Sequence, residues 1–406
     1  MSRDTSNPRR LSSGTARRHL ADLRGATRLL TEATLGVTAV VEAMHARIAT
    51  PPVLPAPART RGITRLAYGS VQGVTRLVGG GVDGALALLT PLLSGHADPG
   101  IEAPSPEREA LLAALNGVLG DHLAASGNPL ALPMVLRHQG RALALERSAL
   151  QAALPQATVR VLVLLHGLCM NDLQWQRAGH DHGAALAQAC GYTPLYLRYN
   201  SGLPVRRNGA SFAAVMESLL AAWPQPIERV ALLAHSMGGL VARSALHQGE
   251  EAGHRWPSRV DDAVFLGTPH QGAPLERAGH GLDLVLGAVP YAAPLARLGR
   301  VRSAGITDLR HGRIGAGSRS IPLPARPRCH AVAACLGAGT GRLKRKILGD
   351  GLVPVDSALG RHADPARHLH FEPGLRLVFD GMNHMALLDR PEVTQALLRW
   401  LCPGSG

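Results

Sequence analysis

Ser236 is the residue of this chain whose surroundings most clearly indicate covalent chemistry. It lies in the segment LLAHSMGG, after an apolar run and directly before the helical segment Leu240–Gln248. A serine on a strained strand-to-helix turn needs small residues two positions before and after it, and Ala234 and Gly238 meet that need. The turn lifts the hydroxyl clear of the sheet, so the segment predicts a nucleophile elbow. The alternative is a glycine-rich turn that holds a buried serine.

His384 and Asp350 are the predicted partners of this serine. His384 follows the apolar run Leu375–Phe379, and Asp350 stands between two glycines in GDGLVP. The chain order is therefore serine, aspartate, histidine. We expect His384 to take the Ser236 proton as general base, and Asp350 to fix the imidazole tautomer and stabilise the imidazolium.

The acid has two alternatives in the sequence, Asp356 and Asp380. Asp380 stands only four residues before His384, but it falls at the end of the preceding strand. Asp350 also has a structural interpretation, because aspartate between glycines is common in turns. We favour Asp350 as the acid of the triad.

Backbone donors for a developing oxyanion are expected in two places. The buried run Val159–His166 ends in His166-Gly167-Leu168, and the loop after such a strand supplies one donor. The residue after the nucleophile, Met237, supplies the other. We therefore assign the oxyanion hole to the N–H groups of Leu168 and Met237. Gly167 allows the close turn, and His166 is interpreted as a structural hydrogen-bonding residue of this loop.

Apolar runs that alternate with helical segments must position these residues. Because the runs are apolar on both faces, they predict a mostly parallel sheet covered by helices on both sides, an α/β fold. The predicted strands are Val159–His166, Tyr192–Tyr199, Arg229–His235, Asp262–Leu266, Cys329–Leu336 and Leu375–Phe379.

These motifs together resemble the α/β-hydrolases, in particular the bacterial lipase and esterase branch related to GPI inositol-deacylases and triacylglycerol lipases. The resemblance covers about residues 158–402 and rests on His166-Gly167, AHSMGGLVAR, FLGTPHQGAPLER, GDGLVPVDSA and Asn383-His384. It implies an α/β-hydrolase that cleaves a carboxylic ester of lipid-like or medium-chain type, without a cofactor. The alternatives are an acyltransferase that uses the same triad and a non-catalytic, membrane-associated scaffold.

Two further regions flank or interrupt this domain. Residues 1–155 are predicted to be a helical region, with its first ~15 residues disordered, and 156–406 to be the catalytic domain. The segment Leu20–Ile48 carries apolar residues at three- and four-residue spacing, and the proline-rich stretch 50–57 predicts a linker.

The apolar insertion 273–324, with GLDLVLGAVPYAAPLARLG at its centre, stands where hydrolases carry a lid; a permanently packed cap is the alternative.

Composition limits the partners. The formal charge is +14, from 43 basic and 29 acidic residues, but the arginines are dispersed and no aromatic residues interleave with them. We therefore expect no nucleic-acid binding. The N-terminal helices are interpreted as a hairpin packed on the catalytic domain, and the alternative is that they make peripheral contact with a membrane. No apolar signal segment or membrane span is recognised, so a cytoplasmic location is expected. The oligomeric state is not indicated.

Cysteine and histidine patterns give no metal site. The five cysteines are irregularly spaced, which predicts reduced thiols rather than a disulfide framework. His180 and His182 lack the spacing of a metal site, so capping and surface roles are expected. Cys169 has no obvious base beside it and is interpreted as a packing residue.

Overall fold

The computed structural model describes residues 13–48, 62–92, 105–273, 303–316, 320–337 and 349–402. The predicted linker 50–57 and the extreme N-terminus, residues 1–12, lie outside the described residues. The chain divides into two compact units. The first holds Met1–Ala103 and Leu123–Leu130, and the second holds Pro104–His122 and Ala131–Gly406.

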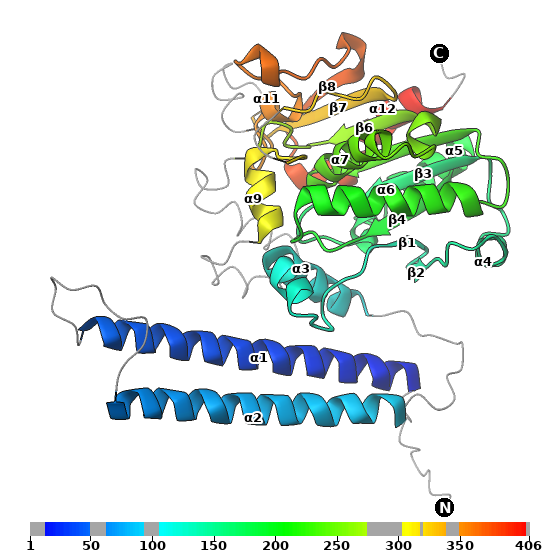
Figure 1. Ribbon diagram of the computed structural model, residues 1–406. Coiled ribbons are helices and arrows are strands. Elements are labelled where there is room, and N and C mark those ends of the chain that lie inside the picture. The colour runs from blue at the N-terminus through cyan, green and yellow to red at the C-terminus, as the bar shows by residue number, and fades with distance from the viewer. Residues whose placement is uncertain are drawn as a thin grey trace, which may run out of the picture. The chain divides into compact units, whose positions relative to one another are not determined.

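The first unit is built on a hairpin of two long helices, α1 (Ser13–Ile48) and α2 (Gly62–Leu92), which lie side by side (Figure 1). The predicted amphipathic helix at Leu20–Ile48 is thereby confirmed as a helix. Its expected apolar stripe is not simply buried, since Leu23 is 54% exposed and Leu30 is 69% exposed.

Polar contacts explain that difference. Arg24 and Arg28 of α1 both bind Asp83 of α2, at 2.7 and 2.8 Å. A Cβ at Gly79 would lie 3.0 Å from the Cβ of Thr31, so the two helices approach closely at this small residue. The face of α1 that meets α2 is therefore the one with Thr31 and the arginines. No helix of the described residues is long and apolar enough to cross a membrane.

The second unit contains an eight-stranded sheet in the order β2-β1-β4-β3-β5-β6-β7-β8. From β4 to β8 all neighbouring strands are parallel, and β1 pairs antiparallel with both β2 and β4. The strands are β1 (Val135–His138), β2 (Arg141–Ala142), β3 (Arg160–Leu165), β4 (Thr193–Arg198), β5 (Arg229–His235), β6 (Val260–Leu266), β7 (Arg328–Cys335) and β8 (Arg376–Asp380). All six strands predicted from apolar runs are present, and the architecture is the expected α/β-hydrolase fold.

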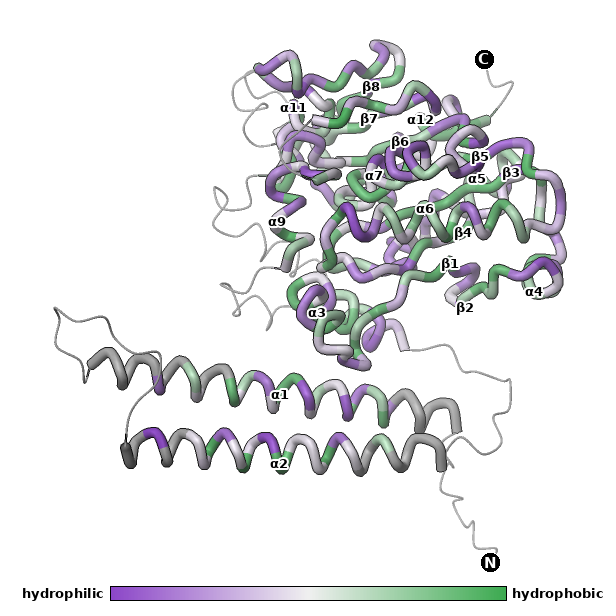
Figure 2. The backbone as a smooth tube through the Cα atoms, viewed as in Figure 1, coloured by the Kyte–Doolittle hydropathy of each residue, from purple (hydrophilic) through white to green (hydrophobic). Residues whose placement is uncertain are grey.

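Helices cover both faces of this sheet (Figures 1 and 2). Alternate residues of β3 show the division, since Val163 packs in one buried cluster and Leu164 in the other. The first face carries α3 (Pro106–Ala125), α4 (Arg147–Ala153), α6 (Val205–Ala222), α7 (Met237–Glu251) and α9 (Ala304–His311). The second carries α5 (His182–Cys190) and α12 (Pro391–Leu401), while the short α11 (Val355–Ala358) follows β7.

Strands β1 and β2 were not expected, because the sequence predicted only helices before residue 155. They form a tight hairpin whose two turn residues, Gln139 and Gly140, both have positive φ, at 50° and 74°. Their sequence, VLRHQGRA, lacks the apolar run of a central strand because they extend the edge of the sheet. The second unit consequently begins well before residue 155, with the segments Pro104–His122 and Ala131 onward.

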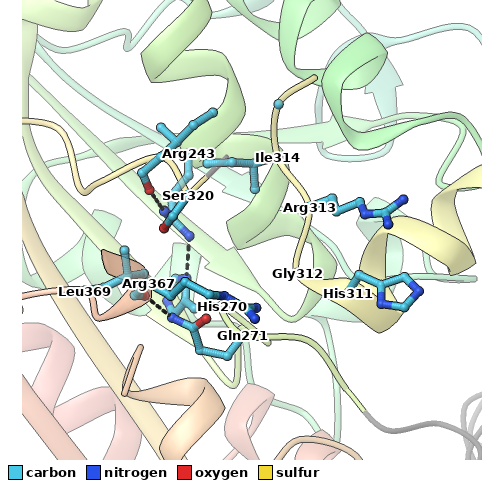
Figure 3. A pocket seen from close by; sticks show the side chains of 12 residues that line it. Arg243, His270, Gln271, His311, Gly312, Arg313, Ile314, Ser320, Arg367 and Leu369 are labelled. Atoms are coloured by element: carbon cyan, nitrogen blue, oxygen red, sulfur yellow. Dashed lines mark hydrogen bonds between the residues drawn. The ribbon is translucent and has the colours of Figure 1, made fainter. Parts of the chain in front are cut away.

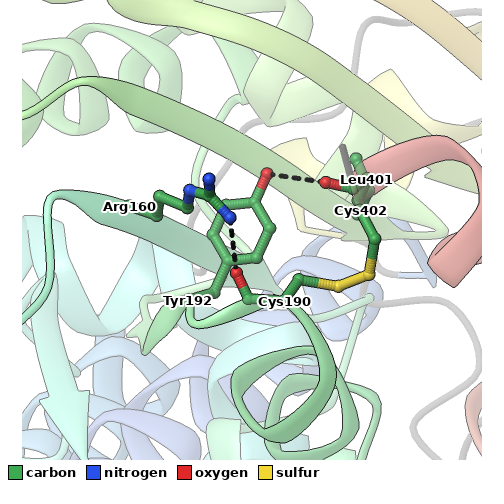
Figure 4. Close-up of a disulfide and its surroundings, with 5 residues drawn as sticks. All are labelled: Arg160, Cys190, Tyr192, Leu401 and Cys402. Carbon is green, nitrogen blue, oxygen red and sulfur yellow. Dashed lines mark hydrogen bonds between the residues drawn. A yellow bond between two sulfur atoms is a disulfide. The ribbon is translucent and has the colours of Figure 1, made fainter. Parts of the chain in front are cut away.

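The prediction that all cysteines are reduced is wrong for one pair. Cys190, the last residue of α5, forms a disulfide with Cys402, which directly follows α12 (Figure 4). Their Cα atoms lie 5.2 Å apart. The sequence could not reveal the pair, because the two residues are 212 positions apart and meet only when α5 and α12 pack on the same face of the sheet.

Candidate active site

Ser236 occupies a sharp turn between β5 and α7. Its backbone has φ 54° and ψ −123°, a conformation that few residues other than glycine adopt. Its N–H donates to the carbonyl of Leu266 at 2.8 Å, which fixes the turn against the end of β6. A Cβ at Gly238 would lie 2.5 Å from the carbonyl oxygen of Leu165, so only glycine lets α7 start this close to β3. The sequence and the fold thus agree on why small residues surround the serine.

His384 and Asp350 meet beyond the ends of β7 and β8. The His384 Nδ1 donates to Asp350 Oδ2 at 2.6 Å, and both side chains are buried. The other carboxylate oxygen accepts the N–H groups of Leu352 and Val353 at 3.0 and 2.8 Å. The N–H of His384 also donates to the Asp350 carbonyl at 3.0 Å. The carboxylate is therefore held in place independently of the imidazole that it accepts from.

The two alternative acids lie elsewhere. Asp356 stands in the first turn of α11 and forms an ion pair with Arg361 at 3.4 Å. Asp380 ends β8 and is exposed. Of the three acids considered from the sequence, Asp350 is the one within hydrogen-bond distance of the His384 ring.

The loop after β3 is tightly bound near Ser236. The His166 ring donates through Nδ1 to the Gly167 carbonyl at 2.8 Å and stacks on Tyr199, with ring centroids 4.3 Å apart. Tyr199 in turn donates its hydroxyl to the His166 carbonyl at 2.7 Å. Burial lowers the pKa of His166 to about 4, so the ring is neutral at pH 7. A Cβ at Gly167 would lie 3.1 Å from the Cβ of Ser236, which places this glycine beside the nucleophile.

The two predicted oxyanion donors occupy suitable backbone positions. Met237 is the first residue of α7, where helical N–H groups have no partner within the helix. Leu168 directly follows Gly167 and is buried at the cavity that contains Ser236. The next residue, Cys169, has φ 59° and donates its N–H to the Ser201 hydroxyl at 3.1 Å, which fixes the turn that orients Leu168.

Helix α3 supports this loop, a contact that could not be expected from the sequence. A Cβ at Gly117 would lie 2.9 Å from the Cα and 3.0 Å from the N of Cys169. The Gly120 carbonyl accepts the side-chain amide of Asn200 at 2.8 Å. Glycines on one face of α3 thus let the helix lie directly against the loops that carry Leu168 and Asn200.

His235 is a further residue of the site that the sequence analysis did not single out. Its ring is fully buried, lies 4.6 Å from the ring of His384 between centroids, and donates through Nε2 to the His384 carbonyl at 3.2 Å. Burial, and next the nearby His384, hold the pKa of His235 well below its usual range. A neutral His235 therefore positions the segment of His384 without adding a charge. The position of His235 directly before Ser236 is the sequence feature that could have indicated its place in the site.

Ser236 and His384 line the same small apolar cavity. It encloses about 460 Å³, part of which is open to solvent. The remaining described lining is Leu168, Met170, His235, Pro269, Ala273, Leu309, Leu352, Val353 and Met385. An apolar cavity that ends at a serine and a histidine is suited to an uncharged acyl group.

Part of the predicted insertion 273–324 packs on this cavity. Helix α9 contributes Leu309 to the lining, and its Gly305 N–H donates to the Gly202 carbonyl at 3.0 Å. The hydroxyl of Ser303, the residue before α9, donates to the Gly117 carbonyl at 2.6 Å, so a hydrogen bond joins the start of α9 to α3. The centre of the insertion, Gly281–Gly299, lies outside the described residues.

The other titratable groups weighed from the sequence are located away from this chemistry. Burial raises the pKa of the Cys169 thiol to about 12, which leaves it un-ionised at neutral pH. His180 and His182 hydrogen-bond to each other at 3.0 Å and both contact Thr394 of α12. Within the described ranges no group of three or more metal-ligating side chains is assembled.

Comparison with known families agrees with the architecture. The family model for a PGAP1-like alpha/beta domain matches residues 212–309, about a quarter of the chain, including the turn at Ser236. This match agrees with the predicted resemblance to the α/β-hydrolases and with the observed fold. None of the curated protein sequences compared matches this chain.

Comparison with solved structures finds similarity to lipases and esterases. The mature lipase BlEst2 of Bacillus licheniformis is 21% identical, covers 59% of this chain and 90% of its own, and has a TM-score of 0.39. An esterase of Pyrococcus furiosus is 15% identical over 60% of this chain and 81% of its own, with a TM-score of 0.38. Lipase B of Aspergillus fumigatus is 13% identical over 96% of this chain and 81% of its own, with a TM-score of 0.34. These values are too low to transfer a substrate or a residue role.

Proposed function

We propose that this chain is a serine hydrolase that cleaves carboxylic ester bonds with Ser236 as nucleophile, His384 as general base and Asp350 as the acid that orients it. The observation that carries the proposal is the arrangement of a serine on a strained turn and a histidine in one apolar cavity, with the histidine bound to a buried carboxylate at 2.6 Å. Each of the three groups then has the surroundings that its role requires.

The proposed reaction has two halves. His384 Nε2 takes the Ser236 proton as Oγ attacks the ester carbonyl, and the negative charge that develops on the carbonyl oxygen is bound by the N–H groups of Leu168 and Met237. The imidazolium then gives its proton to the leaving alcohol, which departs and leaves an acyl-enzyme. Water, deprotonated by His384, attacks the acyl-enzyme and regenerates Ser236 as the acid leaves.

The apolar lining of the cavity favours a lipid-like or medium-chain acyl group. Leu309, Leu352, Val353 and Met385 offer an apolar wall without a charged side chain for a carboxylate or an amine. The proposal needs no cofactor, because each proton transfer and the charge stabilisation is assigned to a group of the chain itself.

The test is hydrolysis of p-nitrophenyl esters from acetate to palmitate. We expect turnover by the full chain with a preference for medium or longer acyl groups, and its loss in Ser236→Ala. A matched control is Ser258→Ala, since Ser258 is exposed and its hydroxyl donates to the nearby Arg255 carbonyl at 2.7 Å, away from the cavity that contains Ser236. Added alcohol separates water from another acyl acceptor, because a transferase forms a new ester. Unchanged turnover in a folded Ser236→Ala variant would refute the assignment.

We further propose that the hairpin touches a membrane surface. Helix α2 exposes Val71, Val74, Val78 and Val82 at three- and four-residue spacing, and Leu77 beside them is 77% exposed. The test is co-sedimentation with vesicles of phosphatidylcholine and phosphatidylglycerol. Wild type should sediment and Leu77→Asp should remain in solution; a wild type that does not sediment contradicts this assignment. The cytoplasmic location expected from the sequence stays a prediction.

A further inference from the structure

A second cavity of the second unit contains a buried arginine that has no carboxylate partner among the residues that the structure describes. It encloses about 770 Å³, is partly open to solvent, and lies between α7, the loop after β6, the end of α9 and residues 367–369 (Figure 3). Arg243 of α7 lines this cavity and is only 4% exposed. No carboxylate is present among the described residues that line this cavity.

The bonds of Arg243 are too few for its charge. Its Nη2 donates to the Ile321 carbonyl at 2.6 Å and its Nη1 to His270 Nδ1 at 3.3 Å, whereas its Nε has no hydrogen-bond partner. Burial lowers the pKa of Arg243 to about 10, so it still carries its charge at neutral pH. Buried charges in proteins are normally paired or bound to an ion, because desolvation without a partner is unfavourable.

His270 reinforces the excess of donors. Because its Nδ1 accepts from Arg243, its proton is on Nε2, and that N–H has no partner. Burial, and next the charge of Arg243, hold the pKa of His270 well below its usual range, so the ring is a neutral donor.

Two further guanidinium groups stand at the opening. Arg313 is exposed and Arg367 is half-buried, and neither forms an ion pair within the described ranges of the chain. The carboxylate of Asp308 interacts electrostatically with Arg313 and accepts a hydrogen bond from the Val205 N–H at 2.9 Å. Three arginines from separate segments therefore line one cavity, and the described residues that line it include no carboxylate.

We propose that this cavity binds a phosphate group, either inorganic phosphate or the phosphate of a larger molecule. A phosphate monoester carries close to two negative charges and three acceptor oxygens, which suits three guanidinium groups better than a carboxylate with one charge does. The open mouth leaves room for an attached alcohol. This inference does not depend on the proposed ester hydrolysis, because binding is measured without turnover.

The site is positioned to affect the catalytic cavity. Arg243 lies seven residues after Ser236 on one helix, a rise of about 10 Å. The loop after β6 contributes Pro269 to the catalytic cavity and His270 to the arginine-lined cavity. Helix α9 likewise contributes Leu309 to the catalytic cavity and His311 to the arginine-lined cavity. Both cavities thus share three walls.

The test is calorimetric titration of the full chain with inorganic phosphate at constant ionic strength. We expect saturable binding of one phosphate, weakened about tenfold in Arg313→Gln and in Arg367→Gln. These two rim variants avoid the folding risk of replacing buried Arg243. Arg207→Gln is the matched control, since it removes one exposed charge from α6 and should leave the affinity unchanged.

Glycerol 3-phosphate distinguishes the two sources of phosphate. Tighter binding of glycerol 3-phosphate than of inorganic phosphate, with the same dependence on Arg313 and Arg367, assigns the site to a phosphorylated alcohol; the reverse order assigns it to free phosphate. The proposal is overturned if neither compound gives saturable binding, or if the rim variants bind no more weakly than Arg207→Gln.

Discussion

Replacement of Asp350 by asparagine isolates the role of one carboxylate with little change of shape. An asparagine Oδ1 can still accept the N–H groups of Leu352 and Val353, which Asp350 accepts at 3.0 and 2.8 Å. Its Nδ2 would then face His384, where the carboxylate now accepts at 2.6 Å. Because an amide nitrogen donates, it would place the imidazole proton on Nε2, the atom that must accept from Ser236.

The expected loss follows from this change of tautomer. In serine hydrolases with this triad the same substitution lowers kcat by about 10⁴, which corresponds to about 5 kcal/mol of transition-state stabilisation. We expect kcat/KM for a p-nitrophenyl ester to fall by 10³ to 10⁴, mainly through kcat, since the acyl cavity does not include the carboxylate.

The controls use the two other acids considered from the sequence. Asp356→Asn and Asp380→Asn should each keep activity within about threefold of wild type, because neither residue is hydrogen-bonded to the His384 ring. Thermal unfolding of each variant checks that the fold is retained. The reasoning would be refuted if kcat/KM of a folded Asp350→Asn fell by tenfold or less. It would also be refuted if either control lost more than about threefold.

Three further changes test the surroundings of the site and the hairpin. Gly117→Ala must displace the backbone of Cys169, because the Cα of Cys169 lies 2.9 Å from the added Cβ, and kcat should fall at least tenfold. The control, Leu111→Ala, changes an exposed residue of the same helix and should have no effect. Equal kcat values for the two variants would contradict this. Burial lowers the pKa of His182 to about 4, so the free energy of unfolding that the neutral ring contributes is fully present above pH 6.5 and is lost as the pH falls toward 4. In urea unfolding, the wild type should lose about 2 kcal/mol more than His182→Asn between pH 7 and pH 5. Equal losses in the two proteins would disprove this. Asp83 has a pKa of about 2 because its arginine partners donate to it, so Asp83→Asn should speed amide exchange in α1 and α2 at pH 7, and unchanged exchange would argue against the pairing.

Much of the fold follows from local sequence. The parallel strands are buried on both faces, so segments such as β3 and β5 are almost uniformly apolar and were recognised with boundaries close to those observed. The turn at Ser236 was recognised because its geometry demands small neighbours, a requirement visible within five residues.

Features that depend on distant partners were not predictable in this way. Strand β1, which lies next to the edge strand β2, carries Arg137, which is buried only because Glu109 and Asp172 bind it at 3.1 and 2.9 Å. The Cys190–Cys402 disulfide likewise requires two helices to pack together. The support of the Cys169 loop by Gly117 joins segments that the sequence assigned to different domains.

For the three acids considered from the sequence, the fold adds their positions relative to His384. Asp350, Asp356 and Asp380 all precede His384 in the sequence; Asp380 is four residues before it, and Asp350 stands between two glycines. Their separation depends on how the segments after β7 and β8 meet, which brings Asp350 alone of these three to the His384 ring.

The most direct test of the account is labelling of the full chain with a fluorophosphonate, followed by peptide mapping. The account predicts one adduct, on Ser236, that is absent in Ser236→Ala and forms much more slowly in Asp350→Asn. A folded wild type that stays unlabelled, or that is labelled at another residue, would contradict the assignment of Ser236 as an activated nucleophile.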